Sequence, residues 1–516
     1  MKPLYLLATT LCMASAFSFW PDTRVKTVGE VWPQPKKVFY DTTNFTFDPT
    51  KVNVVTSVEC DILKSALSAF SKKANIVKSH SGPTKGSTIN LNIALDDPLC
   101  PAEPQMGMVE SYTLSTSSSG IQLSATQIWG LVRGLETLSQ LIYSTKDGLM
   151  MRTATVSGIL ELMAANKMNV FHWHITDNEA FPLRPAAYPE LSKGAYSERH
   201  IYTTDDIKSI VAFARLRAIR VIPEIDTPGH AKAWGLGIPS IVNRCFSSAI
   251  AGREESDDRA MLDPTNDLTY EVLTAVFKEL FALFPDRFAH LGGDEAEYWI
   301  TQCWQNNANV TEYMKLWGMN STKDLEQHYF DRLLAHLTAR DMPKKNFMVW
   351  QEVLDAGIQM PQSIGHVWKG NNRTEQQAFV VKVIKAGHFA VLSSCWYLDH
   401  ISWNIDWRDY YACEPQDVIA LGATPLERER VIGGEAAMWG EMADSTNAIP
   451  RIFPRASAVA EKLWSAEKFT KQTTGDAVWP RLSEWICRMK ERGFPVQPGY
   501  GPGFCDYEYE PALPDF

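Results

Sequence analysis

Two kinds of hydrophobic periodicity divide the chain into a short N-terminal part and a long C-terminal part. Before Met151, alternating strand-like runs such as YTLSTSSSGIQLSA (112–125) precede TQIWGLVRGLETLSQLIY (126–143), in which apolar residues recur at helical spacing. This pattern predicts a small α/β domain. From Gly158 to about Arg492, seven β-rich runs alternate with amphipathic helical segments. These runs are NVFHWHITD (169–177), IRVIPEID (219–226), FAHLGGDE (288–295), FMVWQEV (347–353), SIGHVWK (363–369), FAVLSSCWYL (389–398) and VIGGEAAMWGE (431–441).

The C-terminal part has the element order of a parallel α/β barrel. Each run ends in polar or aromatic residues, and (β/α)8 barrels build their active sites where strands meet the following loops. Such a barrel has eight strands, one more than the pattern supplies. We therefore predict the α/β class, with an incomplete TIM-barrel catalytic domain behind a small α/β N-terminal domain. The expected boundaries are 1–16 for a signal peptide, 17–151 for the small domain, 152–495 for the barrel and 496–516 for a C-terminal tail.

The N-terminus and the cysteines indicate the secretory pathway. MKPLYLLATTLCMASAF combines a Lys, a short apolar stretch and a small-residue cleavage site, as signal peptides do. Beyond Cys12, an even set of cysteines suits an oxidising compartment, and the lack of any CxxC disfavours structural zinc. We expect a lysosomal or secreted protein that does not span a membrane, because no later apolar run is long enough. Four sequons, at Asn44, Asn309, Asn320 and Asn372, are candidate glycosylation sites.

Composition narrows the possible partners. The 516 residues are 45% hydrophobic, which is enough to bury a large core. The formal net charge is -10 and no long Lys/Arg run occurs, so nucleic acid is not an expected partner.

Candidate chemical groups follow the predicted strands. His172 and His174 share one face of their run, and the Pro-Gly turn before His230 can bring its imidazole over the barrel mouth. Asp294 and Glu295 are adjacent, so on a strand they would point to opposite faces. Acids and indoles in one ring favour a sugar site, because aromatic faces stack on sugar CH groups and carboxylates accept hydroxyl hydrogen bonds. The remaining candidates are Asp177, Asp226, Trp350, Trp368, Trp396, Tyr397, Asp399, Trp439 and Glu441.

Six of these segments together resemble one enzyme family. HWHITDNEAFP, IPEIDTPGHAKAW, HLGGDEAEYW, VWQEV, SCWYLD and AAMWGE, in this order, are similar to the animal lysosomal β-N-acetylhexosaminidases of glycoside hydrolase family 20. The resemblance runs from VWPQPKK, at Val31, to the C-terminus. It implies hydrolysis of terminal β-linked N-acetylglucosamine or N-acetylgalactosamine from glycans, without a cofactor or a metal. The family is substrate-assisted, with the carbonyl oxygen of the substrate's 2-acetamido group as nucleophile.

The resemblance also implies individual roles. Glu295 is the general acid and then base, and Asp294 orients and charge-stabilises the acetamido nitrogen. Trp350, Trp368 and Trp439 correspond to indole walls around the acetamide, and Tyr397 to the donor to its carbonyl oxygen. Glu441 and Asp399 correspond to hydroxyl binders at C4 and C6, while His174, Asp177 and His230 set the proton affinity of Glu295.

Quaternary structure and disulfides are implied in the same way. The resemblance implies a homodimer formed through the barrel domain, and the pairs Cys60–Cys100, Cys245–Cys303 and Cys487–Cys505, with Cys395 and Cys413 undecided. Asp399 and His400 stand where some relatives carry an Asn-Arg pair for anionic substrates, so neutral substrates are expected.

One segment departs from the family pattern. Members carry a first barrel strand with a pattern like PRFPWRG, then an aspartate and an Arg-His pair, whereas this chain runs from MMRTATV (150–156) into SGILELMAANK (157–167). By family spacing, about 25 residues are absent, the length of a strand and half a helix. Three interpretations follow: an incomplete gene model or splice form, a weakened or inactive enzyme, and an active enzyme that compensates.

Two other classes of function remain open at this level. The His-x-His motif at 172–174 also begins the metal site of amidohydrolase-type barrels, although His290 and His366 lie within strands rather than at their ends. A non-catalytic sugar-binding protein is favoured by the missing arginine and opposed by the presence of both Asp294 and Glu295.

Overall fold

The structure is a computed structural model. It describes residues 27, 29–38, 47–79, 87–117, 119–142, 155–245, 260–400, 405–471, 475–500 and 505. The expected signal peptide, the sequon at Asn44, the junction at 151/152 and most of the expected tail lie outside these ranges.

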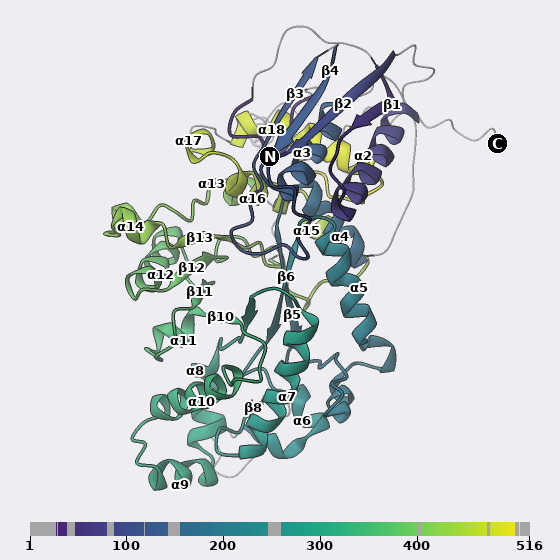
Figure 1. The fold of residues 1–516 in the computed structure, drawn as a ribbon. Coiled ribbons are helices and arrows are strands. Elements are labelled where there is room, and N and C mark those ends of the chain that lie inside the picture. The colour runs from purple at the N-terminus through teal and green to yellow at the C-terminus, as the bar shows by residue number, and fades with distance from the viewer. Residues whose placement is uncertain are drawn as a thin grey trace, which may run out of the picture.

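A four-stranded sheet carrying two helices forms the N-terminal domain, at the top of Figure 1. The strand order is β1-β2-β4-β3, and β3 pairs antiparallel with β4 while the other pairings are parallel. Ile121 and Leu123 of β4 pack with Leu131 and Leu135 of α3 in one buried cluster, as the alternating and helical periodicities require. The bounds are β1 (Phe47–Val55), α2 (Asp61–Ser79), β2 (Ser87–Leu95), β3 (Tyr112–Ser117), β4 (Gly120–Ala125) and α3 (Ile128–Leu141).

Seven parallel strands form the second sheet; six fall within predicted runs, and β10 begins one residue before its run. Their spatial order, β13-β12-β11-β10-β9-β6-β5, follows the order along the chain, as in a barrel. β6 is buried along its whole length, which is expected for a parallel strand covered on both faces. The strands are β5 (Val170–Thr176), β6 (Arg220–Ile225), β9 (Phe288–His290), β10 (Asn346–Trp350), β11 (Ile364–Val367), β12 (Phe389–Leu392) and β13 (Val431–Gly434).

The first and last strands are the two edges of this sheet. In the part of the chain that the structure describes, β5 pairs with β6 and β13 pairs with β12, without a ladder between β5 and β13. Side chains meet across these edges instead. Nδ1 of His172 on β5 lies 3.0 Å from Oε1 of Glu435, which directly follows β13, and the rings of His174 and Trp439 are 4.9 Å apart.

Helices of varied length separate the strands (Figure 1). A short antiparallel pair, β7 with β8, lies in the connection after β6, where the periodicity predicts no strand. The barrel helices and short strands are α4 (Thr155–Ala165), α5 (Thr204–Arg215), α6 (Lys232–Gly237), β7 (Val242–Arg244), β8 (Ala260–Leu262), α7 (Asp267–Leu283), α8 (Ala296–Ile300), α9 (Ala308–Leu316), α10 (Thr322–Leu337), α11 (Gln351–Asp355), α12 (Arg373–Lys385), α13 (Trp407–Ala412), α14 (Pro425–Arg428), α15 (Ala448–Ile452), α16 (Arg455–Trp464), α17 (Glu467–Thr470) and α18 (Gly475–Glu491).

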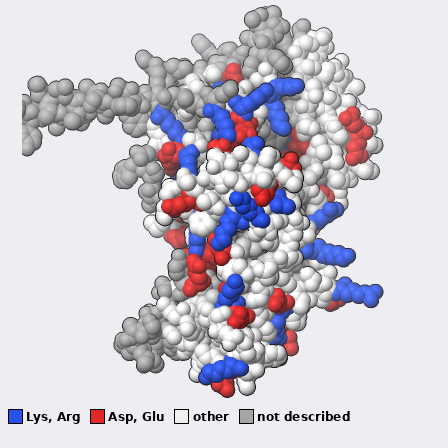
Figure 2. Space-filling model, turned by 90° about the vertical axis from the view of Figure 1, so that its left-hand side faces the viewer, with Lys and Arg blue, Asp and Glu red and all other residues white. Residues whose placement is uncertain are grey.

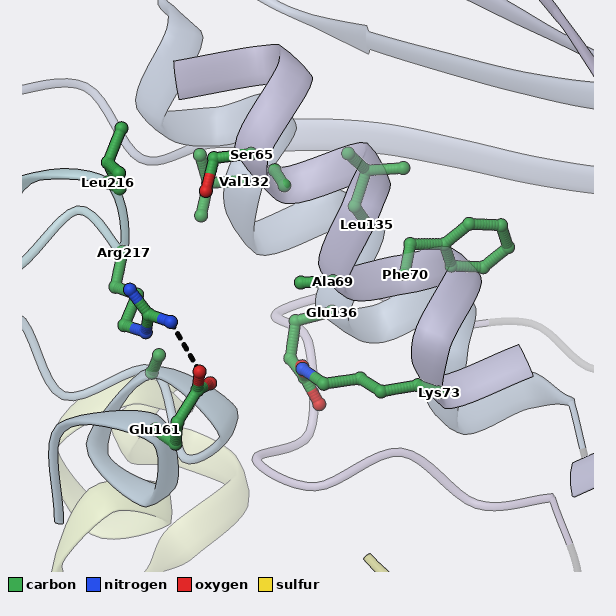
Figure 3. A pocket seen from close by; sticks show the side chains of 12 residues that line it. Ser65, Ala69, Phe70, Lys73, Val132, Leu135, Glu136, Glu161, Leu216 and Arg217 are labelled. Carbon is green, nitrogen blue, oxygen red and sulfur yellow. Dashed lines mark hydrogen bonds and ion pairs between the residues drawn. The ribbon is translucent and has the colours of Figure 1, made fainter. Parts of the chain in front are cut away.

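Charged side chains bind the two domains together. Nη1 of Arg492, just after α18, lies 2.9 Å from Oε1 of Glu136 on α3, and Lys73 of α2 pairs with the same carboxylate. Burial alone would raise the pKa of Glu136, but Lys73 and Arg492 hold it at about 2. A cavity at this interface is lined from both domains, and an ion pair between Arg217 and Glu161 crosses its barrel side (Figure 3). Arg217 precedes β6, so this cavity lies at the opposite end of the barrel from the candidate groups.

Four disulfides are formed among the described cysteines. They include the three pairs implied by the resemblance, Cys60–Cys100, Cys245–Cys303 and Cys487–Cys505. The fourth joins Cys395 to Cys413, the two that the sequence leaves undecided.

The described surface mixes both signs of charge. On the face in Figure 2, Lys and Arg side chains are interspersed with Asp and Glu instead of forming a continuous basic stripe. Among the helices that the structure describes, none is long and apolar enough to cross a membrane.

Candidate active site

The Asp294–Glu295 pair lies in a tight bend at the end of β9. Gly292 and Gly293 have φ values of 72° and 96°, and Glu295 has a φ of 53° at the start of α8. A Cβ on Gly292 would lie 2.6 Å from Cα of Asp226, so only glycine allows the bend after β9 to lie this close to the end of β6. The bend leaves the Asp294 side chain 10% exposed and the Glu295 side chain 34% exposed, so the two acids occupy different environments.

An imidazole joins the two acids to the end of β5. Nε2 of His230 lies 3.7 Å from Oδ2 of Asp294 and 3.7 Å from Oε2 of Glu295, and its Nδ1 donates to Oδ1 of Asp177 at 2.9 Å. Nε2 of His174 lies 3.7 Å from the other carboxylate oxygen of Asp177, Oδ2. Burial alone would lower the pKa of His230, but Asp226, Asp177 and Asp294 raise it to about 11. The three residues expected to support Glu295 therefore form one network, in which the surrounding carboxylates favour the cationic form of His230.

Three indoles and a phenol form an aromatic wall around this acid pair. The ring of Trp350 lies 6.5 Å from that of Trp368 and 6.2 Å from that of Trp439, and Trp368 stacks on Tyr397 at 6.2 Å. Burial, more than the nearby carboxylates, raises the pKa of Tyr397, so the phenol keeps its proton as a hydrogen-bond donor. The structure thus brings together four aromatic residues from four strand ends.

Oδ1 of Asp294 and Oδ1 of Asp399 are among the buried carboxylate oxygens that have no hydrogen-bond partner within the described residues. A buried acceptor without a donor is costly, so each is suited to accept a hydrogen bond from a ligand. Glu441 lies two residues beyond Trp439 and is exposed.

Trp396 does not line the site. It is fully buried in the core beside α13, and its Nε1 donates to the carbonyl of Tyr410 at 2.9 Å. Side chains alternate along a strand end, so its neighbour Tyr397 faces the aromatic wall and Trp396 faces the helices. Including Trp396 among the site candidates was therefore wrong.

A second layer of buried acids supports the aromatic wall, and sequence reasoning missed it. Oε1 of Glu224 accepts from Nε1 of Trp350 at 2.8 Å, while its Oε2 lies 2.6 Å from Nε2 of His172 and 3.1 Å from Nδ1 of His174. Burial alone would raise the pKa of Glu224, but the surrounding imidazoles hold it well below its usual range. A charged residue inside an otherwise apolar strand, as in IPEID, is the signal that could have identified it.

Three histidines from different strands meet in the barrel interior beneath the wall. The ring of His366 stacks on Trp350 at 4.1 Å, and the rings of His172 and His290 lie 4.8 Å apart. Burial lowers the pKa of His366 to about 3, so this imidazole is neutral. The cluster underlies the aromatic wall, so the stacked ring of His366 supports Trp350 from the barrel interior.

The fold and the site define a class of protein. A parallel α/β barrel sheet with an acid pair, a supporting imidazole and a ring of indoles at its strand ends is the site of a glycoside hydrolase. Comparison with known proteins then gives the family. Residues 150–467 match the glycosyl hydrolase family 20 catalytic domain, and residues 31–141 match the domain described as beta-acetyl hexosaminidase like.

Full-length relatives and a solved structure agree with these matches. The chain is 37% identical to beta-hexosaminidase subunit beta of Rattus norvegicus, and the match covers 93% of each of the two chains. It is 35% identical to beta-hexosaminidase A of Caenorhabditis briggsae, with 94% of each chain covered. It superposes on the Flavobacterium johnsoniae chitobiase with a TM-score of 0.74 and 28% identity, covering 90% of this chain and 73% of that one. The chain therefore belongs to glycosyl hydrolase family 20.

Proposed function

We propose that the chain is an exo-acting β-N-acetylhexosaminidase that works by substrate-assisted, retaining hydrolysis. The observation that carries this proposal is Oδ1 of Asp294, a buried acceptor without a donor, beside a half-exposed Glu295 and within an indole wall. An acetamido N–H supplies the donor that this oxygen needs, and the indoles supply the apolar surface that its methyl group needs.

The reaction divides between the two acids. Glu295 protonates the glycosidic oxygen while the acetamido carbonyl oxygen attacks the anomeric carbon, which releases the aglycone and leaves an oxazolinium-like intermediate. Asp294 accepts the acetamido N–H and stabilises the positive charge that develops there. The Glu295 carboxylate then takes a proton from water, which opens the intermediate at the same carbon and gives net retention.

The pocket residues fit the selection of an N-acetyl sugar. Trp350, Trp368 and Trp439 enclose the acetamide, and Tyr397 donates to its carbonyl oxygen. Asp399, through its buried Oδ1, and Glu441, from its exposed position, bind hydroxyl groups of the sugar ring. Neutral N-acetylhexosaminides are the expected substrates, and stronger turnover of a sulfated N-acetylglucosaminide would contradict this.

We propose that this chain lacks the first barrel strand of the family. The edges β5 and β13 approach each other through His172 and Glu435, which is what a sheet with seven strands requires to close. The family arginine on that strand holds the C3 and C4 hydroxyls, and a hydrogen bond to a charged group contributes roughly 1.5–3 kcal/mol. Turnover should therefore be about ten- to hundredfold below that of a chain carrying the strand. Sequencing the transcript across 150–160 shows directly whether a longer form exists.

Secretion, glycosylation and dimerisation complete the proposal. The described sequons Asn309, Asn320 and Asn372 are exposed, as glycan acceptors must be. A lysosomal or secreted location predicts a mature N-terminus near residue 17 and a mass loss on treatment with peptide N-glycosidase. A homodimer predicts twice the monomer mass by light scattering, and a monomer in that measurement would contradict it.

Glu295→Gln tests the core of the proposal. The wild-type chain should hydrolyse a chromogenic N-acetylglucosaminide, and Glu295→Gln should lose most of that activity while still binding N-acetylglucosamine-thiazoline. Equal rates would overturn the role of Glu295. Thiazoline binding without any turnover by the wild type would instead identify a sugar-binding protein, and loss of activity in EDTA would identify a metal-dependent hydrolase.

A further inference from the structure

Glu352 is a buried acid beneath both halves of the proposed site. It lies in α11, two residues beyond Trp350, and is 4% exposed. Both of its carboxylate oxygens accept from Nε1 of Trp368 at 3.0 Å, and Oε1 also accepts from the backbone N–H of Glu295 at 3.4 Å. One side chain therefore contacts an indole of the acetamide wall and the backbone of the proposed proton donor.

The backbone of Glu295 needs such an anchor. Its φ of 53° lies in the left-handed region, which is unfavourable for a residue with a Cβ. Glu295 precedes the five-residue helix α8, so its N–H has no partner within that helix. The Glu352 carboxylate supplies this partner and so stabilises the backbone conformation that presents the Glu295 side chain.

We propose that Glu352 is a positioning residue for the hydrolysis, which holds the Glu295 backbone and the Trp368 indole in one fixed arrangement. This inference rests on the proposed role of Glu295 as the proton donor. Trp368 lies 6.2 Å from Tyr397, so a displaced Trp368 would also disturb the donor to the acetamide carbonyl.

The charges around Glu352 make its contribution depend on pH. Asp294 faces it from the β9 bend, Glu326 from α10 and Lys369 from the end of β11, with Nζ of Lys369 3.0 Å from Oε1. Burial, assisted by Asp294 and opposed by Lys369, raises the pKa of Glu352 to about 7. Below that pH the group is a neutral acid, and above it is a carboxylate whose hydrogen bonds to Trp368 and Glu295 are charge-assisted and stronger.

Glu352→Gln and Glu352→Ala separate positioning from simple stability. Glutamine imitates the neutral acid, so kcat/KM of Glu352→Gln should stay within about threefold of wild type at pH 5 and fall to about a tenth of it at pH 8. Alanine removes every contact, so kcat should fall about a hundredfold and the Ki of N-acetylglucosamine-thiazoline should rise about tenfold at both pH values. The matched control is Glu297→Gln, an exposed change that removes a carboxylate lying 2.6 Å from Nζ of Lys369. It should leave all three parameters unchanged.

The outcomes distinguish this inference from the proposed function. A purely structural role would lower the amount of folded enzyme, while the enzyme that folds would keep the wild-type KM, Ki and pH dependence of kcat/KM. That result would overturn the inference. A wild-type-to-Glu352→Gln ratio that stays flat from pH 5 to pH 8 would also overturn it. If Glu295→Gln were as active as wild type, the proposed function would fail, while the thiazoline Ki of Glu352→Ala would still test the contact with Trp368.

Discussion

The His172–Glu435 pair gives the sharpest test of how this barrel closes. Oε1 and Oε2 of Glu435 lie 3.0 and 3.1 Å from Nδ1 of His172, whose Nε2 lies 2.6 Å from Glu224. In Glu435→Gln the His172 imidazolium keeps its contact with Glu224 but loses its contact with the carboxylate that follows β13. Removing a hydrogen bond between charged groups costs roughly 1.5–3 kcal/mol. With an unfolding entropy of about 2.1 cal/mol/K per residue, this loss corresponds to a decrease of about 2–4 °C in the Tm of the barrel domain.

The sign of the pH dependence follows from both partners. Burial alone would lower the pKa of His172, but Glu435 and Glu224 raise it to about 10. The stability that protonated His172 contributes is therefore complete below about pH 6.5 and is lost as the pH rises toward 10. Burial alone would raise the pKa of Glu435, but His172 holds it at about 2, so its contribution is lost as the pH falls below about 4.5. The Tm difference should therefore be largest between pH 4.5 and 6.5.

Differential scanning calorimetry at pH 5.5 and pH 9.5 measures this difference. Glu312→Gln on α9 is the control, because that side chain is 64% exposed and should leave Tm unchanged at both pH values. A Glu435→Gln chain with the wild-type Tm at pH 5.5, or with the same deficit at both pH values, would refute closure of the barrel by this pair.

Three further predictions concern the site and its supports. Asp294→Asn should lower kcat on a chromogenic N-acetylglucosaminide by about 10²- to 10³-fold, because the charge that stabilises the intermediate is lost. A higher KM with an unchanged kcat would contradict that role. Gly292→Ala should lower Tm or abolish soluble expression, since its Cβ would overlap Asp226, the residue after β6. Gly440→Ala has open space and should be neutral in the same thermal scan. Burial raises the pKa of Glu326 to about 7, so the protonated form should contribute up to about 3 kcal/mol of stability below pH 4.5, lost as the pH rises through 7. Urea titrations across that range should show a smaller loss for Glu326→Gln, and an equal loss would contradict the argument.

Most of the fold was predictable because hydrophobic periodicity is a local property. Each barrel strand is a short apolar run followed by polar residues, and each of the seven predicted runs overlaps one strand. The β7–β8 pair was not predictable, because Val242–Arg244 and Ala260–Leu262 are too short to show a period and depend on each other across a long connection.

The candidate site was predictable only where the residues form motifs. Asp294, Glu295 and His230 stand in HLGGDE and DTPGH, whereas Glu224 and Glu352 are single acids within apolar runs. Their importance depends on which indole each contacts, Trp350 for Glu224 and Trp368 for Glu352, and those contacts join different strands. Trp396 shows the same limit, because its sequence neighbours place it with the site while its side chain enters the core.

The sequence by itself determined the class of fold, the family and the pair of acids, because apolar period and short motifs are read along the chain. Tertiary structure decided the environment of each group: His230 as a cation between two acids, Asp294 Oδ1 as a buried acceptor, and Glu352 as a support for both Glu295 and Trp368. Burial and Coulomb interactions depend on distances between strands far apart in sequence. For the same reason, only the folded chain brings the edges β5 and β13 within reach of the contact between His172 and Glu435.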